Sequence, residues 1–100
     1  MAYLHTINKS PEHPALTQAT VALNTGDTLL FIEDGVNALI AGSLNAKAVK
    51  DIADTYPVYC LKADVQARGL MNRLPNWVTV VDFDGFVALT EQHTKTLSWF

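Results

Sequence analysis

The chain contains one cysteine, Cys60, and its thiol is the side chain best suited to nucleophilic or sulfur-transfer chemistry. It lies in the apolar run 58–61, which predicts a buried strand. Burial in apolar surroundings raises the pKa of a thiol and hides it, so such a cysteine is more often a small hydrophobic residue. Lys62 would share its face of the strand and supports a stabilised thiolate only weakly. One cysteine also excludes an intramolecular disulfide and a cysteine-only metal site.

The remaining candidates for chemistry are polar residues that follow the predicted strands. They are Asn8, Lys9, Ser10, Glu33, Asp34, Lys62, Asp64, Asp82 and Asp84. Parallel strands bring their carboxyl ends to one edge, where such a set could hold Mg²⁺, although helix capping alone accounts for most of the acids. His5, His13 and His93 are too scattered to predict a metal site. The sequence contains no glycine-rich nucleotide loop and no nucleophile elbow, so it predicts no cofactor.

Apolar runs separated by helical spacing must position these residues. Strands are predicted at residues 3–7, 28–32, 56–61 and 77–83, and helices around residues 16–23, 36–40, 44–52, 64–68 and 85–93. Gly26, Gly42 and Gly69 are expected just after three of the helices, and Asp34 is a candidate cap. This alternation predicts a small three-layer α/β/α domain with a mostly parallel sheet of four to five strands.

Length and composition limit the function classes. One hundred residues with 49% hydrophobic content and no repeat or linker predict a single domain over residues 1–100. A net charge of −3 argues against a general nucleic-acid surface, which needs a basic face. No stretch approaches the ~20 apolar residues of a membrane span, and the N-terminus lacks a signal-peptide pattern. The expected location is therefore the cytoplasm.

Large aromatic residues gather near the end of the sequence. Trp99 and Phe100 follow a polar stretch, so they are expected either to pack on the protein's own core or to dock on a partner. Phe86 and Trp77 face the same choice, with core packing favoured for both. Trp99, Phe100 and Phe86 are therefore the candidates for a partner interface.

Four blocks of sequence resemble those of one family, in the same order and spacing. They are residues 4–11, 29–36, 64–70 and 80–90, and together with the terminal tryptophan they span nearly the whole chain. On these blocks the sequence resembles the TusB/DsrH family of sulfur-relay proteins. The resemblance implies the small α/β/α fold of the DsrE-like group.

The resemblance also implies a function. Such proteins are subunits of a TusB–TusC–TusD heterohexamer, which relays persulfide sulfur from a TusA-like carrier to a TusE-like carrier for 2-thiolation of the tRNA wobble uridine. They have no cofactor and no direct nucleic-acid contact of their own. The alternative within the family is a DsrH-like subunit of a DsrE–DsrF–DsrH complex in oxidative sulfur metabolism.

The resemblance places the main sulfur-accepting cysteine on the TusD or DsrE subunit. Some DsrH proteins have another in the first helix, where this sequence has Ala19 and Thr20. This difference favours the TusB side of the family and a non-catalytic role. Two alternatives remain: a sulfur carrier that uses Cys60, and a small anion-binding regulatory domain that uses the strand-end acids and the loop at Lys9 and Ser10.

Overall fold

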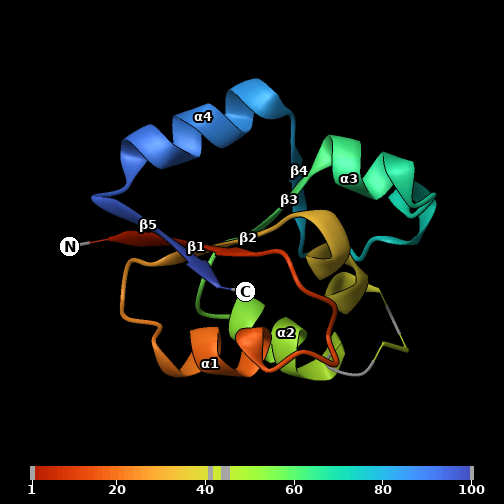
Figure 1. Cartoon of the computed structure of the whole chain (residues 1–100), viewed down its shortest axis with the longest axis horizontal. Helices are drawn as coiled ribbons and strands as arrows, with labels where there is room; N and C mark the ends of the chain where they lie inside the picture. Colours follow the sequence, from red (N-terminus) through yellow and green to blue (C-terminus); the bar gives the residue numbers. More distant parts are fainter. Residues whose placement is uncertain (1, 41, 44–45, 100) are drawn as a thin grey trace.

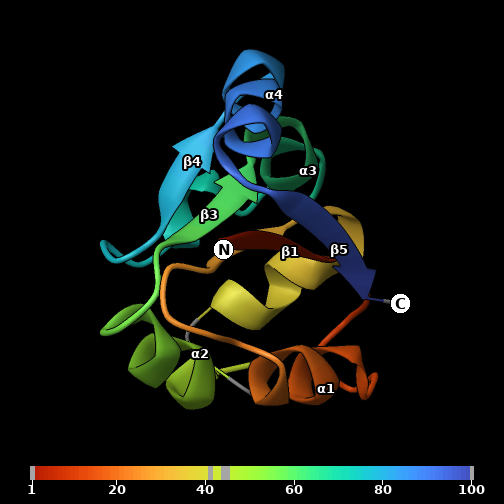
Figure 2. The ribbon, with the colours of Figure 1, turned by 90° about the vertical axis from the view of Figure 1, so that its left-hand side faces the viewer.

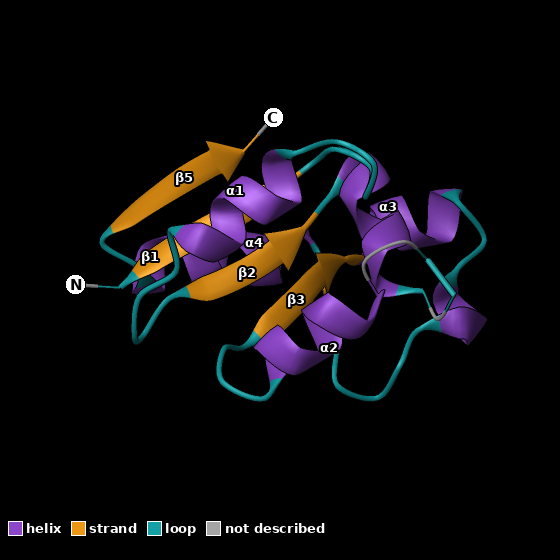
Figure 3. Ribbon diagram, turned by 90° about the horizontal axis from the view of Figure 1, so that it is seen from below, coloured by secondary structure: helices purple, strands orange, loops and turns teal. Residues whose placement is uncertain are grey.

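Five parallel strands form one sheet in the computed structural model, which describes residues 2–40, 42–43 and 46–99. Their order across the sheet is β4-β3-β2-β1-β5 (Figure 1), and Figure 3 shows β5, β1, β2 and β3 side by side. The strands are β1 (Tyr3–Ile7), β2 (Thr28–Phe31), β3 (Val58–Leu61), β4 (Thr79–Val81) and β5 (Lys95–Trp99). Every pairing between neighbouring strands is parallel, so the predicted α/β fold is confirmed.

Helices cover both faces of this sheet. They are α1 (Ala15–Val21), the 3₁₀ helix η1 (Glu33–Leu39), α2 (Ala46–Ala53), α3 (Lys62–Ala67), the short 3₁₀ helix η2 (Met71–Arg73) and α4 (Phe83–Gln92). Figures 1 and 2 show α1 and α2 on one face and α4 on the other, which gives the three predicted layers. None of the helices in the described part of the chain is long and apolar enough to cross a membrane.

The central strands β1 and β2 are buried on both faces, and β2 is almost entirely apolar, whereas β1 includes the buried polar residues His5 and Thr6. Leu29 and Phe31 point to the face covered by α1 and α2, where they join the larger core cluster. Leu4 and Leu30 point to the opposite face and pack with Leu89 of α4 in a smaller cluster. All four strand side chains are inaccessible to solvent, as expected for the interior of a parallel sheet.

The fifth strand, β5, was not predicted from the sequence. It pairs with β1 residue by residue, from Tyr3 beside Lys95 to Ile7 beside Trp99. Lys95, Thr96 and Ser98 are exposed and Leu97 and Trp99 are half-buried, because an edge strand covers only part of the core. Its sequence, in which only Leu97 and Trp99 are apolar, therefore lacks the apolar continuity of β2.

The fourth strand is shorter than predicted, because the chain turns into a helix at Asp82. The Asp82 carboxylate caps α4 by accepting a hydrogen bond from the Gly85 backbone N–H at 2.8 Å. Phe83, expected at the end of a strand, is therefore the first residue of α4. The segment after β2 also differs, because it forms a 3₁₀ helix rather than an α-helix, with Val36 and Leu39 both buried at a spacing of three residues.

Gly35 allows η1 to pass directly over the end of β1. The Ile7 carbonyl oxygen accepts a hydrogen bond from the Ile32 N–H at 3.0 Å, and a Cβ atom at position 35 would overlap with that same oxygen. Glu33, next to this crossing, has a positive φ of 49°. The backbone at the carboxyl edge of the sheet is therefore held in a tight conformation.

Candidate functional site

Cys60 lies in the middle of the protein's larger core cluster. Its side chain has no exposed surface, as the sequence predicted, and it shares the cluster with Phe31 and Val58. Burial raises the pKa of the Cys60 thiol to about 11. Lys62 was expected on the same strand face as Cys60, but in the structure Lys62 is the first residue of α3. The thiolate fraction at pH 7 is then on the order of one in ten thousand.

This burial predicts that Cys60 is inert in the folded protein. A small aromatic disulfide reagent added to the native chain at pH 7.5 should label Cys60 only at the rate of unfolding, and the same reagent in 6 M guanidinium should label it within minutes. The labelling rate of a small-molecule thiol under the same conditions serves as the reference. Rapid, complete labelling of the native protein would contradict this prediction and revive the carrier hypothesis for Cys60.

Three of the strand-end acids, Asp34, Asp64 and Asp82, take part in local hydrogen bonds and ion pairs. Asp64 accepts a hydrogen bond from the Glu33 N–H at 2.8 Å, and Arg68 donates to Asp34 at 2.8 and 3.3 Å. Asp34 therefore pairs with Arg68 and does not cap the helix, while Asp82 caps α4. Across the described residues, no group of three or more His, Cys, Asp or Glu side chains could hold a metal ion. These contacts give the acids structural roles.

The loop after β1 does not lead directly into a helix. Lys9 is exposed and Ser10 half-buried, but α1 begins only at Ala15 and is too short to provide a strong anion site. The His13 ring caps this helix by accepting a hydrogen bond from the Ala15 N–H at 3.0 Å. The buried Oδ1 of Asn8 lacks a hydrogen-bond partner in the described structure. These contacts add no observation in favour of the anion-binding alternative.

A polar cluster formed by His5, Asp27 and Trp99 was not predicted from the sequence. The Trp99 indole N–H donates to His5 Nδ1 at 3.0 Å, and the two rings stack with centroids 6.1 Å apart. Because the indole can only donate, Nδ1 accepts, and Nε2 carries the proton that it donates to Asp27 Oδ2 at 2.8 Å. This chain of hydrogen bonds joins β1 and β5 to the turn before β2.

Asp27 is fully buried and accepts two further hydrogen bonds, from the backbone N–H groups of Tyr3 at 2.9 Å and Asn24 at 3.0 Å. Burial alone would raise its pKa, but the hydrogen bonds from Tyr3, His5 and Asn24 outweigh burial and hold the pKa below its usual value. Asp27 was not predicted as a site residue, because an acid directly after a glycine is typical of a turn. Its position directly before a fully apolar strand was the available signal.

The three predicted interface residues have different positions. Trp99 is half-buried, packs against the larger core cluster and donates a hydrogen bond to His5. Phe86 packs partly against the smaller core cluster and meets Phe83 edge-on, with ring centroids 6.3 Å apart. Phe100 lies outside the described residues. Phe83 itself is 69% exposed, and Val87 one turn further along α4 is also exposed.

Comparison with known proteins gives full-length matches. The family model described as DsrH like protein matches residues 9–96. Protein TusB of Pectobacterium carotovorum subsp. carotovorum is 36% identical over 96 residues, which cover 96% of this chain and 99% of that protein. Protein TusB of Serratia proteamaculans is 37% identical over 99 residues with the same coverage.

Two solved structures show the same fold. The crystal structure of the ychN protein from E. coli superposes with a TM-score of 0.82 at 21% identity, covering 99% of both chains. The structure of MTH1491 from Methanobacterium thermoautotrophicum, a protein of unknown function, has a TM-score of 0.69 at 16% identity and covers 97% of this chain and 96% of its own. At these identities the likeness concerns the fold.

The fold and the site together define a class: small α/β proteins with five parallel strands, here with the single thiol enclosed in the core. Within that class, the match to the family model and the full-length relatives identify the family. The chain belongs to the DsrH-like family.

Proposed function

We propose that this protein is a non-catalytic subunit of a cytoplasmic TusBCD-like complex that relays persulfide sulfur for 2-thiolation of the tRNA wobble uridine. The observation that carries the proposal is the burial of Cys60 in a chain that belongs to the DsrH-like family. The full-length relatives are named Protein TusB, which favours the tRNA pathway over the oxidative pathway of DsrE–DsrF–DsrH complexes.

Sulfur relay has chemical requirements that this chain does not meet alone. An acceptor thiolate attacks the terminal sulfur of the donor persulfide, the S–S bond breaks, and the donor leaves as a thiolate. The acceptor must therefore be ionised and accessible. Cys60 is neither, and the sequence has no second cysteine. The reacting thiol is then supplied by a TusD-like subunit, and TusA-like and TusE-like carriers dock on the assembled complex.

The contact face that we propose for the TusC-like and TusD-like partners is the outer surface of α4. Phe83 and Val87 are exposed there, with Phe86 half-buried behind them. α4 lies on the face of the sheet opposite α1 and α2 (Figure 2), and Leu89 on its inner side packs with Leu4 and Leu30. Aromatic residues of this kind often contribute most of the binding energy at the centre of an interface.

Co-expression tests both the complex and its contact face. The tagged chain should co-purify with TusC-like and TusD-like proteins, and Phe83→Asp should weaken that association by about tenfold or more because it places a charge in an apolar interface. Val21→Asp is the matched control, since Val21 is 84% exposed at the end of α1 on the opposite face. Its binding should stay within about twofold of the unchanged chain.

The two levels of the proposal fail in different ways. No co-complex with the unchanged chain would contradict the proposed subunit role itself. A co-complex that Phe83→Asp leaves intact while Val21→Asp disrupts it would keep the subunit role and move the interface to the α1 face. Thermal unfolding of both variants tests for misfolding. Both side chains are exposed, so both variants should unfold at close to the temperature of the unchanged chain.

A further inference from the structure

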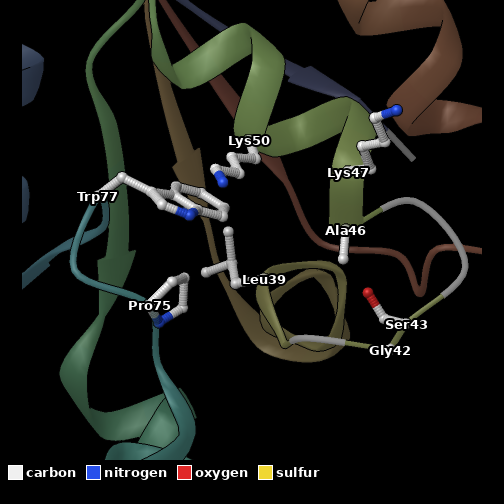
Figure 4. Close-up of a pocket in the computed structure, with 8 residues that line it drawn as sticks. All are labelled: Leu39, Gly42, Ser43, Ala46, Lys47, Lys50, Pro75 and Trp77. Atoms are coloured by element: carbon white, nitrogen blue, oxygen red, sulfur yellow. The ribbon is translucent and has the colours of Figure 1, made fainter.

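A pocket unrelated to Cys60 and to the α4 face lies where η1, α2 and the loop before β4 meet. Its volume is about 410 Å³, within the range of protein ligand sites. Figure 4 shows Trp77 and Pro75 on one side of it, Ala46 and Ser43 on the other, and Leu39 between them. Leu39 is buried and Trp77 packs against the main core, so the apolar surface of the pocket is held in place by the fold.

The pocket is surrounded by positive charge. Lys47 and Lys50 of α2 line it, and Arg73 of η2 lines an adjoining hollow of about 300 Å³. The two hollows share Gly42 and Ser43, so they form one groove. The described residues that line this groove include no acid, although the whole chain has a net charge of −3. None of the three cations forms an ion pair within the described part of the chain.

The placement of Lys47 adds a second electrostatic argument. It lies in the first turn of α2, which contains no acidic residue. The N-terminal end of a helix carries positive potential, so a lysine there is unfavourable unless an anion offsets it. The wall of the pocket formed by Ala46 and Lys47 therefore concentrates positive potential beside the apolar surface of Trp77 and Leu39.

We propose that this groove binds an extended acidic segment of a partner protein, with one large apolar side chain seated against Trp77, Pro75 and Leu39. Carboxylates that flank this side chain would pair with Lys47 and Lys50, and the segment would continue along the second hollow toward Arg73. Two joined hollows fit an extended peptide better than a compact small molecule. The inference uses only residues of this chain and does not rest on the proposed sulfur-relay role.

The test is an NMR titration of the isotope-labelled full chain with synthetic peptides. The probe has one tryptophan between runs of aspartate and glutamate; one comparison peptide has lysine in place of the acids, and another has serine in place of tryptophan. The probe should shift the Trp77 indole N–H signal and the amide signals at the start of α2. Raising the salt concentration should weaken binding, because exposed charges are screened.

Charge reversal locates the binding. The double variant Lys47→Glu, Lys50→Glu should bind the acidic probe about tenfold more weakly. The matched control Lys9→Glu, Lys95→Glu makes the same change in net charge at exposed positions outside the groove and should bind within about twofold of the unchanged chain. Both pairs are exposed, so both variants should fold.

Several outcomes would overturn the inference. They are an absence of shift at Trp77, equal binding of the lysine or serine peptide, and equal weakening by the two double variants. A Trp77 shift that depends on protein concentration without any peptide would assign the groove to a second copy of the chain, and would overturn it as well.

Discussion

Replacing Asp27 by asparagine is expected to lower the free energy of unfolding by about 3 kcal/mol, a large share of the roughly 5–15 kcal/mol typical of a domain. The carboxylate accepts three hydrogen bonds, from Tyr3, Asn24 and His5, and has no exposed surface. An asparagine amide turns one acceptor into a donor, which would then face another N–H group. Urea unfolding followed by tryptophan fluorescence measures the loss.

Asp54→Asn is the control for this substitution. Asp54 is exposed at the end of α2, so its replacement should change the unfolding free energy by less than about 0.5 kcal/mol. Equal losses for the two variants would show that the buried cluster contributes nothing specific. The fold would then depend on apolar packing alone at this edge of the sheet.

The pH dependence of Asp27 gives an independent readout of the same cluster. Its pKa in the folded protein lies below the ordinary value of 3.8, so the folded state binds this proton less readily than the unfolded chain. The stability that it contributes is fully present above about pH 4 and is lost as the pH falls further. The difference between the unchanged protein and Asp27→Asn should therefore narrow below about pH 4, and a constant difference would contradict this assignment.

Replacing Gly35 by alanine is expected to lower the free energy of unfolding by about 3 kcal/mol or more. The added Cβ would overlap with the Ile7 carbonyl oxygen, which is backbone and cannot rotate away. Either η1 must move off the end of β1 or the Ile32–Ile7 hydrogen bond must lengthen. Thermal and urea unfolding measure the effect.

Gly42→Ala is the control that separates steric overlap of an added Cβ from the strain of a positive φ. Gly42 has a positive φ of 90°, but a Cβ there would meet nothing within 4 Å. Its replacement should cost only about 1 kcal/mol, because a left-handed conformation is unfavourable for alanine. A Gly35→Ala variant no less stable than Gly42→Ala would show that η1 can shift at little cost.

Sequence patterns predicted the centre of the fold well and its edges poorly. The strand at residues 3–7 was predicted with the bounds that the structure shows, and four of its five residues are buried. The last strand was missed, since Lys95 and Thr96 are exposed and nothing in an edge strand requires apolar continuity. Phe83 was placed in the strand predicted at residues 77–83, whereas the Asp82 cap makes it the first residue of α4.

The candidate functional residues also divide into those that local sequence predicts and those that it does not. Burial of Cys60 was predicted because four consecutive apolar residues leave a thiol no polar neighbour. The cluster of His5, Asp27 and Trp99 could not be predicted, because its members are 22 and 94 residues apart along the chain. The groove at Trp77 and Lys47 likewise joins segments that meet only after the helices pack.

The sequence by itself determined the α/β class, the parallel sheet and the buried state of the single thiol, because local apolar continuity and helical spacing carry that information. Only the tertiary structure decided that Trp99 bonds to His5 and packs partly on the core, that Phe83 faces outward, and that Asp27 is a buried acceptor. Those outcomes depend on which strands become neighbours and on which helix covers each face, and contacts between distant segments determine both.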